Sequence, residues 1–516
     1  MTNNYQQKFR FSMKKISPAF VVVFIVVILV SNLSQAQNFE DALRYSYINP
    51  AATARSMGFG NALGSVGGDF ASLSVNPAGI GVYRRSEIIF TPSLKINSIK
   101  SDYLGQTTPE NNTRFTINNI GVVFTKTPQG KRYENSAWKT VSFGIGINRL
   151  ADFNRNYSYE GLNKESSYSE LFSNDANNYP NDVNSNPTSL AYLGYQSYLV
   201  GEDNKGFYSL AYEATNQLRQ KRYVEDRGGM NEMVFSLGGN YQEKLMLGAT
   251  IGIPFLNFNR ESYFQENDVS GNTSNYFSTF RYKETLKTSG IGFDLKLGAI
   301  YKPSDFIRFG AALHTPTWLA LTDYYDQSLT TNTENYKQDI LKIADPDPVT
   351  KVDADQIVFD YTIRTPWKAV LSATGMLGTF GFITADYEYV DYRSAKLGFT
   401  EEYRDMQTTR NNYLHSITKA ASNFRIGAEG HVQNIFVRVG CGYYGSPYTQ
   451  SLSGENMINI SGGIGYRTEH FFADLGWVHT RFNEYQVPYS LPDIATPTAK
   501  LANNLNNIAL SIGIKM

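Results

Sequence analysis

From about residue 85 to its end, the chain alternates apolar side chains with small or polar ones. The last segment shows this most clearly, with apolar residues at every second position: Ile508, Leu510, Ile512, Ile514 and Met516. The residues between them are alanine, serine, glycine and lysine. Successive side chains on a β-strand point to opposite faces. The pattern therefore predicts strands with one apolar face, and it argues against a mainly helical chain.

Two architectures produce such strands. A soluble sandwich packs the apolar faces of two sheets together. A transmembrane barrel turns those faces to lipid and encloses the polar ones. Here the face opposite the apolar one is rich in glycine and charge, as in 291–301, where Asp294 and Lys296 share it with two glycines. Tyrosine and tryptophan gather near the predicted strand ends, which is typical of the interfacial girdles of membrane barrels. Both features favour the barrel.

The segments and their connections specify the barrel further. We predict fourteen strands, at 86–100, 112–126, 137–152, 230–241, 244–262, 280–302, 305–321, 356–377, 380–397, 413–431, 434–449, 456–467, 470–482 and 504–516. Long and short connections mostly alternate, and the longest span about 150–230 and 322–355. Bacterial outer-membrane barrels have an even strand number, short periplasmic turns and long outer loops. The predicted fold is therefore all-β, a 14-stranded antiparallel transmembrane β-barrel over residues 85–516.

Residues 1–36 have the order of a secretory signal. Basic residues precede an apolar run from Ala19 to Val30, and Ser34-Gln35-Ala36 follows it with small residues at both positions that a signal peptidase reads. A membrane anchor is the alternative, but the run is shorter than the roughly 17–25 residues of a membrane span. We expect cleavage after Ala36 and export to the outer membrane of a Gram-negative cell.

Residues 37–84 do not alternate and are rich in glycine and alanine. Asn76-Pro77-Ala78-Gly79 reads as a turn, because Pro77 fixes its own φ and keeps Asn76 extended. A compact segment of small residues ahead of a barrel predicts a small helical hatch that plugs the lumen. The turn either positions this hatch or is an ordinary turn.

The order of these motifs resembles the FadL/TodX family of outer-membrane hydrophobic-compound transporters, and the chain looks like a divergent member. The resemblance rests on Ala51–Gly60 and Asn76–Gly79 in the hatch, and it continues in the barrel at 290–294, 301–305, 308–310, 314–316, 384–389, 424–427, 437–440, 446–447 and 463–466. Two features depart from the family: the last residue is Met516 rather than an aromatic, and the 150–230 loop is long.

The resemblance implies passive uptake of a hydrophobic compound, such as a long-chain fatty acid, that enters the hatch-gated lumen and leaves sideways through the barrel wall. A lateral exit requires a strand that breaks its ladder. The family's kink lies on the third strand, where this chain has Gly144, Gly146 and Asn148. These residues are the candidate gate. The alternative for the glycines is close packing against the hatch.

Charged residues share the inward parity of several predicted strands, and buried charges need partners. We expect most to form ion pairs that tie strands and hatch together. Arg425 and Arg438 are the candidates for holding a ligand carboxylate through a bidentate contact. The histidines are scattered and no serine, histidine and acid share a coherent spacing. The sequence therefore predicts no catalytic residue, no metal site, no cofactor and no enzyme activity.

A second function uses the same barrel. It also resembles a subunit of a protein-secretion machine, PorV, whose outer loops bind protein partners. We expect membrane lipid and a hydrophobic small molecule as partners of the channel, or proteins at the long outer loops under the alternative. Balanced charge, 47 basic and 47 acidic residues, gives no basis for a nucleic-acid partner. A monomer is expected.

Overall fold

The computed structural model describes residues 39–47, 52–211, 217–449, 455–492, 494 and 496–516. All of them belong to the unit that spans 36–516. The predicted signal segment and its cleavage point lie outside the described residues. No helix of the described ranges combines the length and apolarity that a membrane crossing requires.

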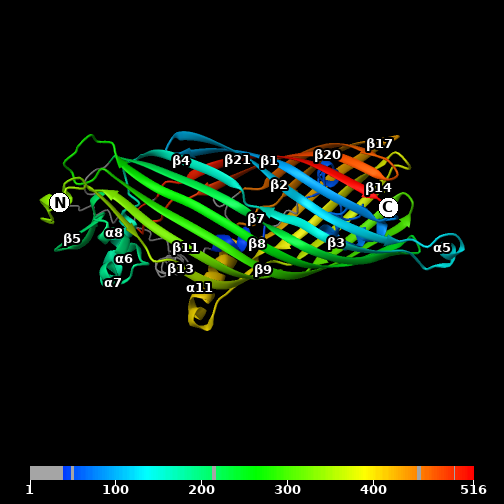
Figure 1. The fold of residues 1–516 in the computed structure, drawn as a ribbon, viewed down its shortest axis with the longest axis horizontal. Coiled ribbons are helices and arrows are strands. Elements are labelled where there is room, and N and C mark those ends of the chain that lie inside the picture. The colour runs from blue at the N-terminus through cyan, green and yellow to red at the C-terminus, as the bar shows by residue number, and fades with distance from the viewer. Residues whose placement is uncertain (1–38, 48–51, 212–216, 450–454, 493, 495) are drawn as a thin grey trace, which may run out of the picture. The chain divides into compact units, whose positions relative to one another are not determined.

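Strands dominate this unit and close on themselves (Figure 1). The ring has fourteen strand positions, all antiparallel to their neighbours. In chain order they are β1 (Glu87–Tyr103), β2 (Gln106–Lys126), β3 (Trp138–Asp152), β7 (Leu218–Tyr241), β8 (Leu245–Asp268), β9 (Thr279–Ser304), β10 with β11 (Ile307–His314, Trp318–Asn332), β13 with β14 (Ile357–Arg364, Lys368–Met376), β15 with β16 (Gly381–Asp391, Lys396–Gly398), β17 (Ala420–Val432), β18 (Ile435–Tyr444), β19 (Met457–Arg467), β20 (Phe471–Gln486) and β21 (Ala499–Lys515). Pairing of β1 with β21, from Glu87–Lys515 to Asp102–Lys500, closes the ring.

The outward face of the ring is an uncovered apolar band. Leu371, Ile426 and Val439, on three different strands, are 58%, 53% and 59% exposed. A water-soluble protein rarely exposes contiguous apolar patches larger than a few hundred Å², so this band is a lipid-facing surface. The structure thus confirms the predicted 14-stranded antiparallel barrel.

Several elements differ from the sequence prediction. Strand β7 begins at Leu218, not 230, and β8 runs on to Asp268, because these outer extensions carry polar residues on both faces and hide the alternation. The predicted strands 305–321 and 356–377 are each interrupted, at Thr315–Thr317 and Thr365–Trp367. Each interruption contains a proline, which cannot donate to a ladder. Residues 404–417 form a helix, α11 (Arg404–Ile417), which projects from the wall in Figure 1.

The hatch lies in the lumen, at the end of the barrel that carries the short turns. It contains α3 (Ala54–Gly58), α4 (Ser72–Val75) and the 3-10 helix η1 (Pro77–Val82). Small residues let it approach the wall closely. A Cβ on Gly427 would lie 2.0 Å from the Phe59 carbonyl oxygen, and one on Gly440 2.4 Å from the Gly60 nitrogen. The first helix of the 37–84 segment, α2 (Phe39–Arg44), lies further up the lumen, against β8 and α11.

A cap of outer connections covers the other end. It includes β4 (Arg155–Asn163), α6 (Glu170–Asn178), α7 (Asp182–Ser185), α8 (Leu190–Gln196), β5 (Val200–Asp203) and β6 (Gly206–Ser209). Phe172, Leu193 and Leu199 of the cap pack with Phe264 and Tyr282 of the barrel. Smaller elements are α10 (Tyr336–Asp339), β12 (Val349–Asp353), η2 (Tyr392–Ser394), η3 (Glu401–Tyr403) and, at the short-turn end, α5 (Lys131–Asn135).

Candidate functional site

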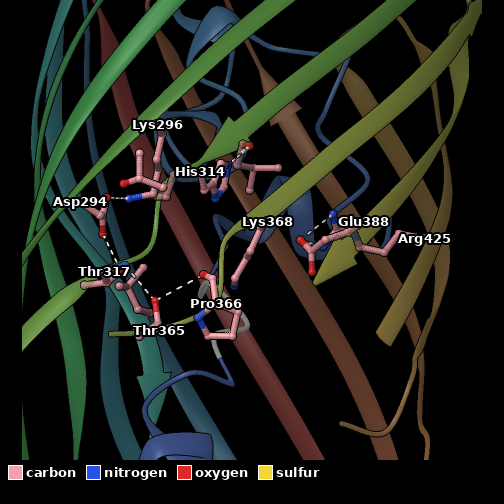
Figure 2. A pocket seen from close by; sticks show the side chains of 13 residues that line it. Asp294, Lys296, His314, Thr317, Thr365, Pro366, Lys368, Glu388 and Arg425 are labelled. Atoms are coloured by element: carbon pink, nitrogen blue, oxygen red, sulfur yellow. Dashed lines mark hydrogen bonds and ion pairs between the residues drawn. The ribbon is translucent and has the colours of Figure 1, made fainter. Parts of the chain in front are cut away.

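A polar pocket lies in the lumen directly against the hatch (Figure 2). Its walls come from strands far apart in the chain and from the end of α4: Ser74, Val75, Leu150, Asp294, Lys296, His314, Thr315, Thr317, Thr365, Pro366, Lys368, Glu388 and Arg425. The two strand interruptions supply four of these residues. The site therefore sits where the wall departs from regular β-structure.

One side of the pocket is an acidic pair held by a lysine. The Lys296 ammonium donates to the carboxylates of Asp294 and Glu232, and all three are buried. Ser74 of the hatch donates to Glu232 Oε2 at 2.8 Å, and Thr317 donates to Asp294 Oδ2 at 3.1 Å. This cluster links the hatch to β7, β9 and the start of β11.

The other side carries Lys368, Arg425 and His314 around Glu388. Arg425 lies 3.4 Å from Glu388 Oε2 and 3.6 Å from Asp386 Oδ2. His314 Nε2 is 2.9 Å from the Val75 carbonyl oxygen of the hatch, which makes it the donor of that hydrogen bond. Figure 2 shows the Lys368 and Arg425 side chains extending into the same space as Glu388. The two cations give this side of the pocket groups that attract an anion.

Arg438, the second arginine singled out from sequence, lies elsewhere. It is fully buried and lines no part of the pocket. Its Nε is 2.6 Å from Glu429 Oε2, and its Nη1 is 2.8 Å from Asp474 Oδ1. Hatch residue Arg55 also binds Glu429, through bonds of 2.9 and 3.0 Å. Arg438 is thus part of an ion-pair network between wall and hatch.

Two charged groups of the hatch have shifted pKa values. Burial alone would lower the pKa of Arg55, but the Glu429 carboxylate raises it above its ordinary value. Burial raises the pKa of the Asp69 carboxyl, and Arg55 together with the Thr53 hydroxyl, 2.8 Å from Oδ2, partly offsets that rise. Arg55 therefore stays charged at all ordinary pH values.

The Asn76-Pro77-Ala78-Gly79 turn packs against β9. Asn76 accepts a hydrogen bond from the Ala78 N–H at 3.1 Å and donates to the carbonyls of Gly64 and Ala299 at 2.5 and 3.3 Å. The Gly79 carbonyl accepts from the Gly68 N–H at 3.0 Å. Any Cβ at Gly298 of β9 would lie 1.9 Å from Asn76 Oδ1. These contacts join the turn to the hatch segment around Gly64 and Gly68 and to β9 of the wall.

Gly144, Gly146 and Asn148 of β3 all face the hatch. A Cβ on Gly144 would lie 2.7 Å from the Leu73 side chain, and one on Gly146 2.6 Å from Phe70 Cζ. Asn148 donates to Ser74 Oγ at 2.8 Å. Their β2 ladder is regular from Lys126–Val141 up to Asn119–Asn148 and ends at that pair. The glycines therefore lie below the break rather than in it.

Beyond the break, the chain leaves the wall toward the lumen. Strand β4 pairs with β7 and has no ladder to β2. Its Tyr157 and Tyr159 pack instead with Ile99 and Tyr103, inward residues of β1. Because β2 separates β3 from β1 in the ring, β4 must pass on the inner side of β2. The lower part of β2 is paired on both edges, but its upper part is paired with β1 alone.

The lumen above the pocket holds an apolar cluster beside buried ion pairs such as Arg260–Asp226. A cluster of buried side chains from α2, from the inner faces of the surrounding strands and from α11 fills it, among them Leu43, Tyr45, Phe153, Met230, Phe258, Leu321, Tyr361 and Leu414. A polar site with apolar surroundings suits an amphiphile better than a small hydrophilic solute. Within the described ranges, no group of three or more His, Cys, Asp or Glu side chains could hold a metal ion.

Together these features define a class: a 14-stranded membrane barrel with an internal hatch and an interrupted wall. A FadL homologue of Pseudomonas aeruginosa has a similar fold, with a TM-score of 0.51 and 12% identity over 91% of this chain and 99% of its own. A mutant of the monoaromatic hydrocarbon channel TodX matches with a TM-score of 0.50 and 11% identity over 90% and 99%. The chain therefore has the fold of the FadL/TodX transporters.

The toluene transporter TbuX of Ralstonia pickettii is also similar, with a TM-score of 0.49 and 16% identity over 89% of this chain and 99% of its own. No family model matches the sequence. No curated protein sequence matches it either.

Sequence reasoning missed the part of Lys368 and His314 in the pocket. Lys368 follows Thr365-Pro366-Trp367, and His314 precedes Thr315-Pro316-Thr317. Two Thr-Pro pairs inside predicted strands were the available signal, since proline is rare in paired strands. That signal marks the interruptions, and inward side chains at their edges line the pocket.

Proposed function

We propose that the protein is an outer-membrane channel for the passive uptake of hydrophobic compounds, with long-chain fatty acids as the default ligand. A cleaved signal over residues 1–36 exports it, and the short turns face the periplasm. The ligand enters between the outer loops, passes the lumen above the hatch, and leaves through the wall into the bilayer. The hatch of residues 37–84 keeps water and small solutes out.

The break between β2 and β4 carries this proposal. A ladder that stops at Asn119–Asn148 leaves one stretch of wall without backbone pairing, and β4 beyond it packs into an apolar cluster inside the lumen. A compound that dissolves poorly in water can then move from lumen to lipid without crossing the periplasm. The strands on either side supply the hydrogen-bonded frame that keeps the barrel closed elsewhere.

A fatty acid also carries a carboxylate. We infer that Arg425, with Lys368 beside it, receives this group in the polar pocket, since a guanidinium can bind a carboxylate through two hydrogen bonds. Both arginines face two carboxylates, but Arg425 lines the pocket with contacts of 3.4 and 3.6 Å, whereas Arg438 lies outside it with contacts of 2.6 and 2.8 Å. The proposal therefore assigns the carboxylate contact to Arg425 and withdraws it from Arg438.

Cross-linking tests the lateral exit. Ser158 Oγ of β4 lies 2.7 Å from Glu110 Oε1 of β2, so Glu110→Cys with Ser158→Cys places thiols on both sides of the break. The free Cys441 is first changed to serine. A short bis-maleimide, which adds across both thiols, should then reduce uptake of a fluorescent long-chain fatty acid into cells about tenfold or more. A bis-methanethiosulfonate of similar length, which forms disulfides with loss of sulfinate, should block uptake in the same way until a reductant restores it.

The control joins β2 to β3, below the break. Thr125 and Ser142 are register partners on β2 and β3, with hydroxyls 2.9 Å apart. Cross-linked Thr125→Cys with Ser142→Cys should transport like the uncross-linked protein. Full transport after cross-linking at Glu110 and Ser158 would rule out this exit.

A second candidate function is a barrel subunit of a protein-secretion machine. The observation that favours it is a connection between β11 and β12 that exposes Ile340, Leu341 and Ile343, at 49%, 39% and 39%. Apolar side chains on an outer loop suit a protein partner. Mass spectrometry of the extracted protein separates the two: bound fatty acid supports the channel, and a stoichiometric protein with an empty lumen supports the secretion role.

A further inference from the structure

A groove of about 450 Å³ opens on the outward face of the barrel wall, next to the strand interruptions and distinct from the luminal pocket. Two rungs of the sheet form it. Register pairing places Phe293, Trp318, Arg364 and Lys396 side by side in one rung, across β9, β11, β13 and β16. The next rung toward the loops holds Ile291, Ala320, Thr362 and Gly398. Small residues in this second rung make the surface concave.

The groove lies at the edge of the lipid-facing band. A transmembrane strand needs about 9–11 residues, so a strand that starts at Ile307 reaches the far interface near Trp318. Trp367 and Tyr389, with ring centroids 5.5 Å apart, lie at the same end of β14 and β15. Tryptophan and tyrosine collect at this level in membrane barrels. Below it the outward side chains are apolar, such as Leu313, which is 51% exposed.

One wall of the groove is apolar and the other is cationic. Ile291, Phe293 and Trp318 are 58%, 47% and 50% exposed. Lys396 is exposed and Arg364 half-buried. Arg364 Nη2 makes only a long contact of 3.4 Å to the Ser394 carbonyl, and its buried Nε has no hydrogen-bond partner in the described part of the chain.

Neighbouring acidic side chains do not neutralise Arg364 and Lys396. Asp391, at the end of β15, pairs with Arg393 at 2.9 Å. Asp360, two rungs further toward the loops, accepts a hydrogen bond from Thr322. Of all the ion pairs between described residues, none involves Arg364 or Lys396. The groove therefore presents two cations beside an apolar wall at the depth of the lipid headgroups. This arrangement is complementary to an anion that carries an acyl chain.

We propose that this groove binds a single phosphate-bearing lipid of the outer leaflet, with the phosphate on Arg364 and Lys396 and one acyl chain along Phe293 and Trp318. The guanidinium binds phosphate oxygens in a planar fork and the ammonium adds a point charge. An interfacial setting strengthens both contacts relative to water, because the local dielectric is lower. This binding goes beyond the transport proposal and does not depend on it.

Native mass spectrometry of the full mature protein in detergent tests the site. The probes are dimyristoyl phosphatidylglycerol and an uncharged glucosyl diacylglycerol with the same chains. The protein should retain one phosphatidylglycerol in preference to the glucolipid. Arg364→Gln and Lys396→Gln should each weaken that binding about tenfold. The matched control, Lys287→Gln, removes an exposed lysine of β9 outside the groove and should leave it unchanged.

A second variant leaves both charges in place. Ala320→Trp fills the second rung from the outward face and should displace the lipid while the barrel keeps its heat-modifiable mobility on gels. Equal retention of the two lipids would overturn the proposal. So would a Lys287→Gln loss as large as those of Arg364→Gln and Lys396→Gln, or unchanged binding in Ala320→Trp.

Discussion

Gly427 shows how a single residue sets the fit between hatch and wall. Its missing Cβ leaves room for the Phe59 carbonyl, which would be 2.0 Å away. Gly427→Ala should destabilise the hatch by about 1–3 kcal/mol, the usual cost of overpacking. The measurement is limited proteolysis of residues 52–84 in detergent. Gly430→Ala on the same strand is the control, because its Cβ would meet nothing closer than 3.8 Å. Equal protection in both variants would contradict the close fit.

Arg425 and Arg438 share an inward face but should respond differently to substitution. Arg438→Gln leaves Glu429 and Asp474 as buried carboxylates short of a cation, which should cost about 3–5 kcal/mol of stability.

Arg425→Gln should lower the affinity for a fatty acid about tenfold and leave affinity for the corresponding alcohol unchanged. Thermal unfolding and ligand titration measure the two effects. A carboxylate preference that survives Arg425→Gln would remove Arg425 from the site.

Inward parity could be predicted from sequence for both arginines, because the period of two assigns every strand residue to a face. The depth of each arginine along the barrel axis could not be predicted from sequence. The two residues lie on neighbouring strands, yet one lines the pocket and the other binds Glu429 against the hatch. That difference depends on register and on where the hatch sits, and both are set by contacts between distant segments such as Arg55 and Glu429.

At the scale of elements, the turn at Asn76 joins the hatch to β9. Asn76→Ala removes the N-cap of η1 and two donor contacts, which should cost about 1–3 kcal/mol. Hydrogen exchange of the amides in 63–82 should accelerate about tenfold or more, while β18 and β19 stay protected. Asn76→Asp keeps the cap acceptor but places a buried carboxylate against the Gly64 and Ala299 carbonyl oxygens, so its effect should be at least as large. Unchanged exchange in Asn76→Ala would show that other contacts suffice to hold the hatch.

Strands were predictable where one face meets lipid and the other meets the lumen, as in β18, predicted at 434–449 and observed at Ile435–Tyr444. The strand β4 was not, because it lies inside the wall and its residues have no lipid-facing side. The outer extensions of β7 and β8 were missed because both of their faces are largely polar. Two strands are interrupted, at Thr315–Thr317 and at Thr365–Trp367. The apolar alternation continues on both sides of each interruption, so the sequence pattern predicted one continuous strand in each case.

At the scale of the molecule, the apolar band dictates the solvent. With side chains such as Phe309 and Ile464 at 48% and 53% exposed all around the ring, the mature chain should be monodisperse only in detergent or lipid. Size-exclusion chromatography with light scattering, with and without detergent, measures this. A monodisperse detergent-free monomer would refute the membrane barrel and, with it, the transport and lipid-binding proposals.

Two closures stand in series along the lumen, the hatch at the short-turn end and the cap at the loop end. Ser169 and Ser209 hydrogen-bond to each other, so a short linker can replace residues 170–208 without moving the barrel. The cap-deleted protein should fold and show no ion conductance in planar bilayers, because the Arg55–Glu429 contact and the Asn76 turn still hold the hatch.

Loosening the hatch in the cap-deleted protein should open the lumen. Arg55→Ala with Glu429→Ala removes an ion pair between hatch and wall. The cap-deleted protein that also carries these two substitutions should conduct ions in brief openings. The same two substitutions with the cap intact should stay near background conductance. A steady pore after cap deletion alone would show that the hatch does not seal the lumen, and that the outer connections carry the permeability barrier.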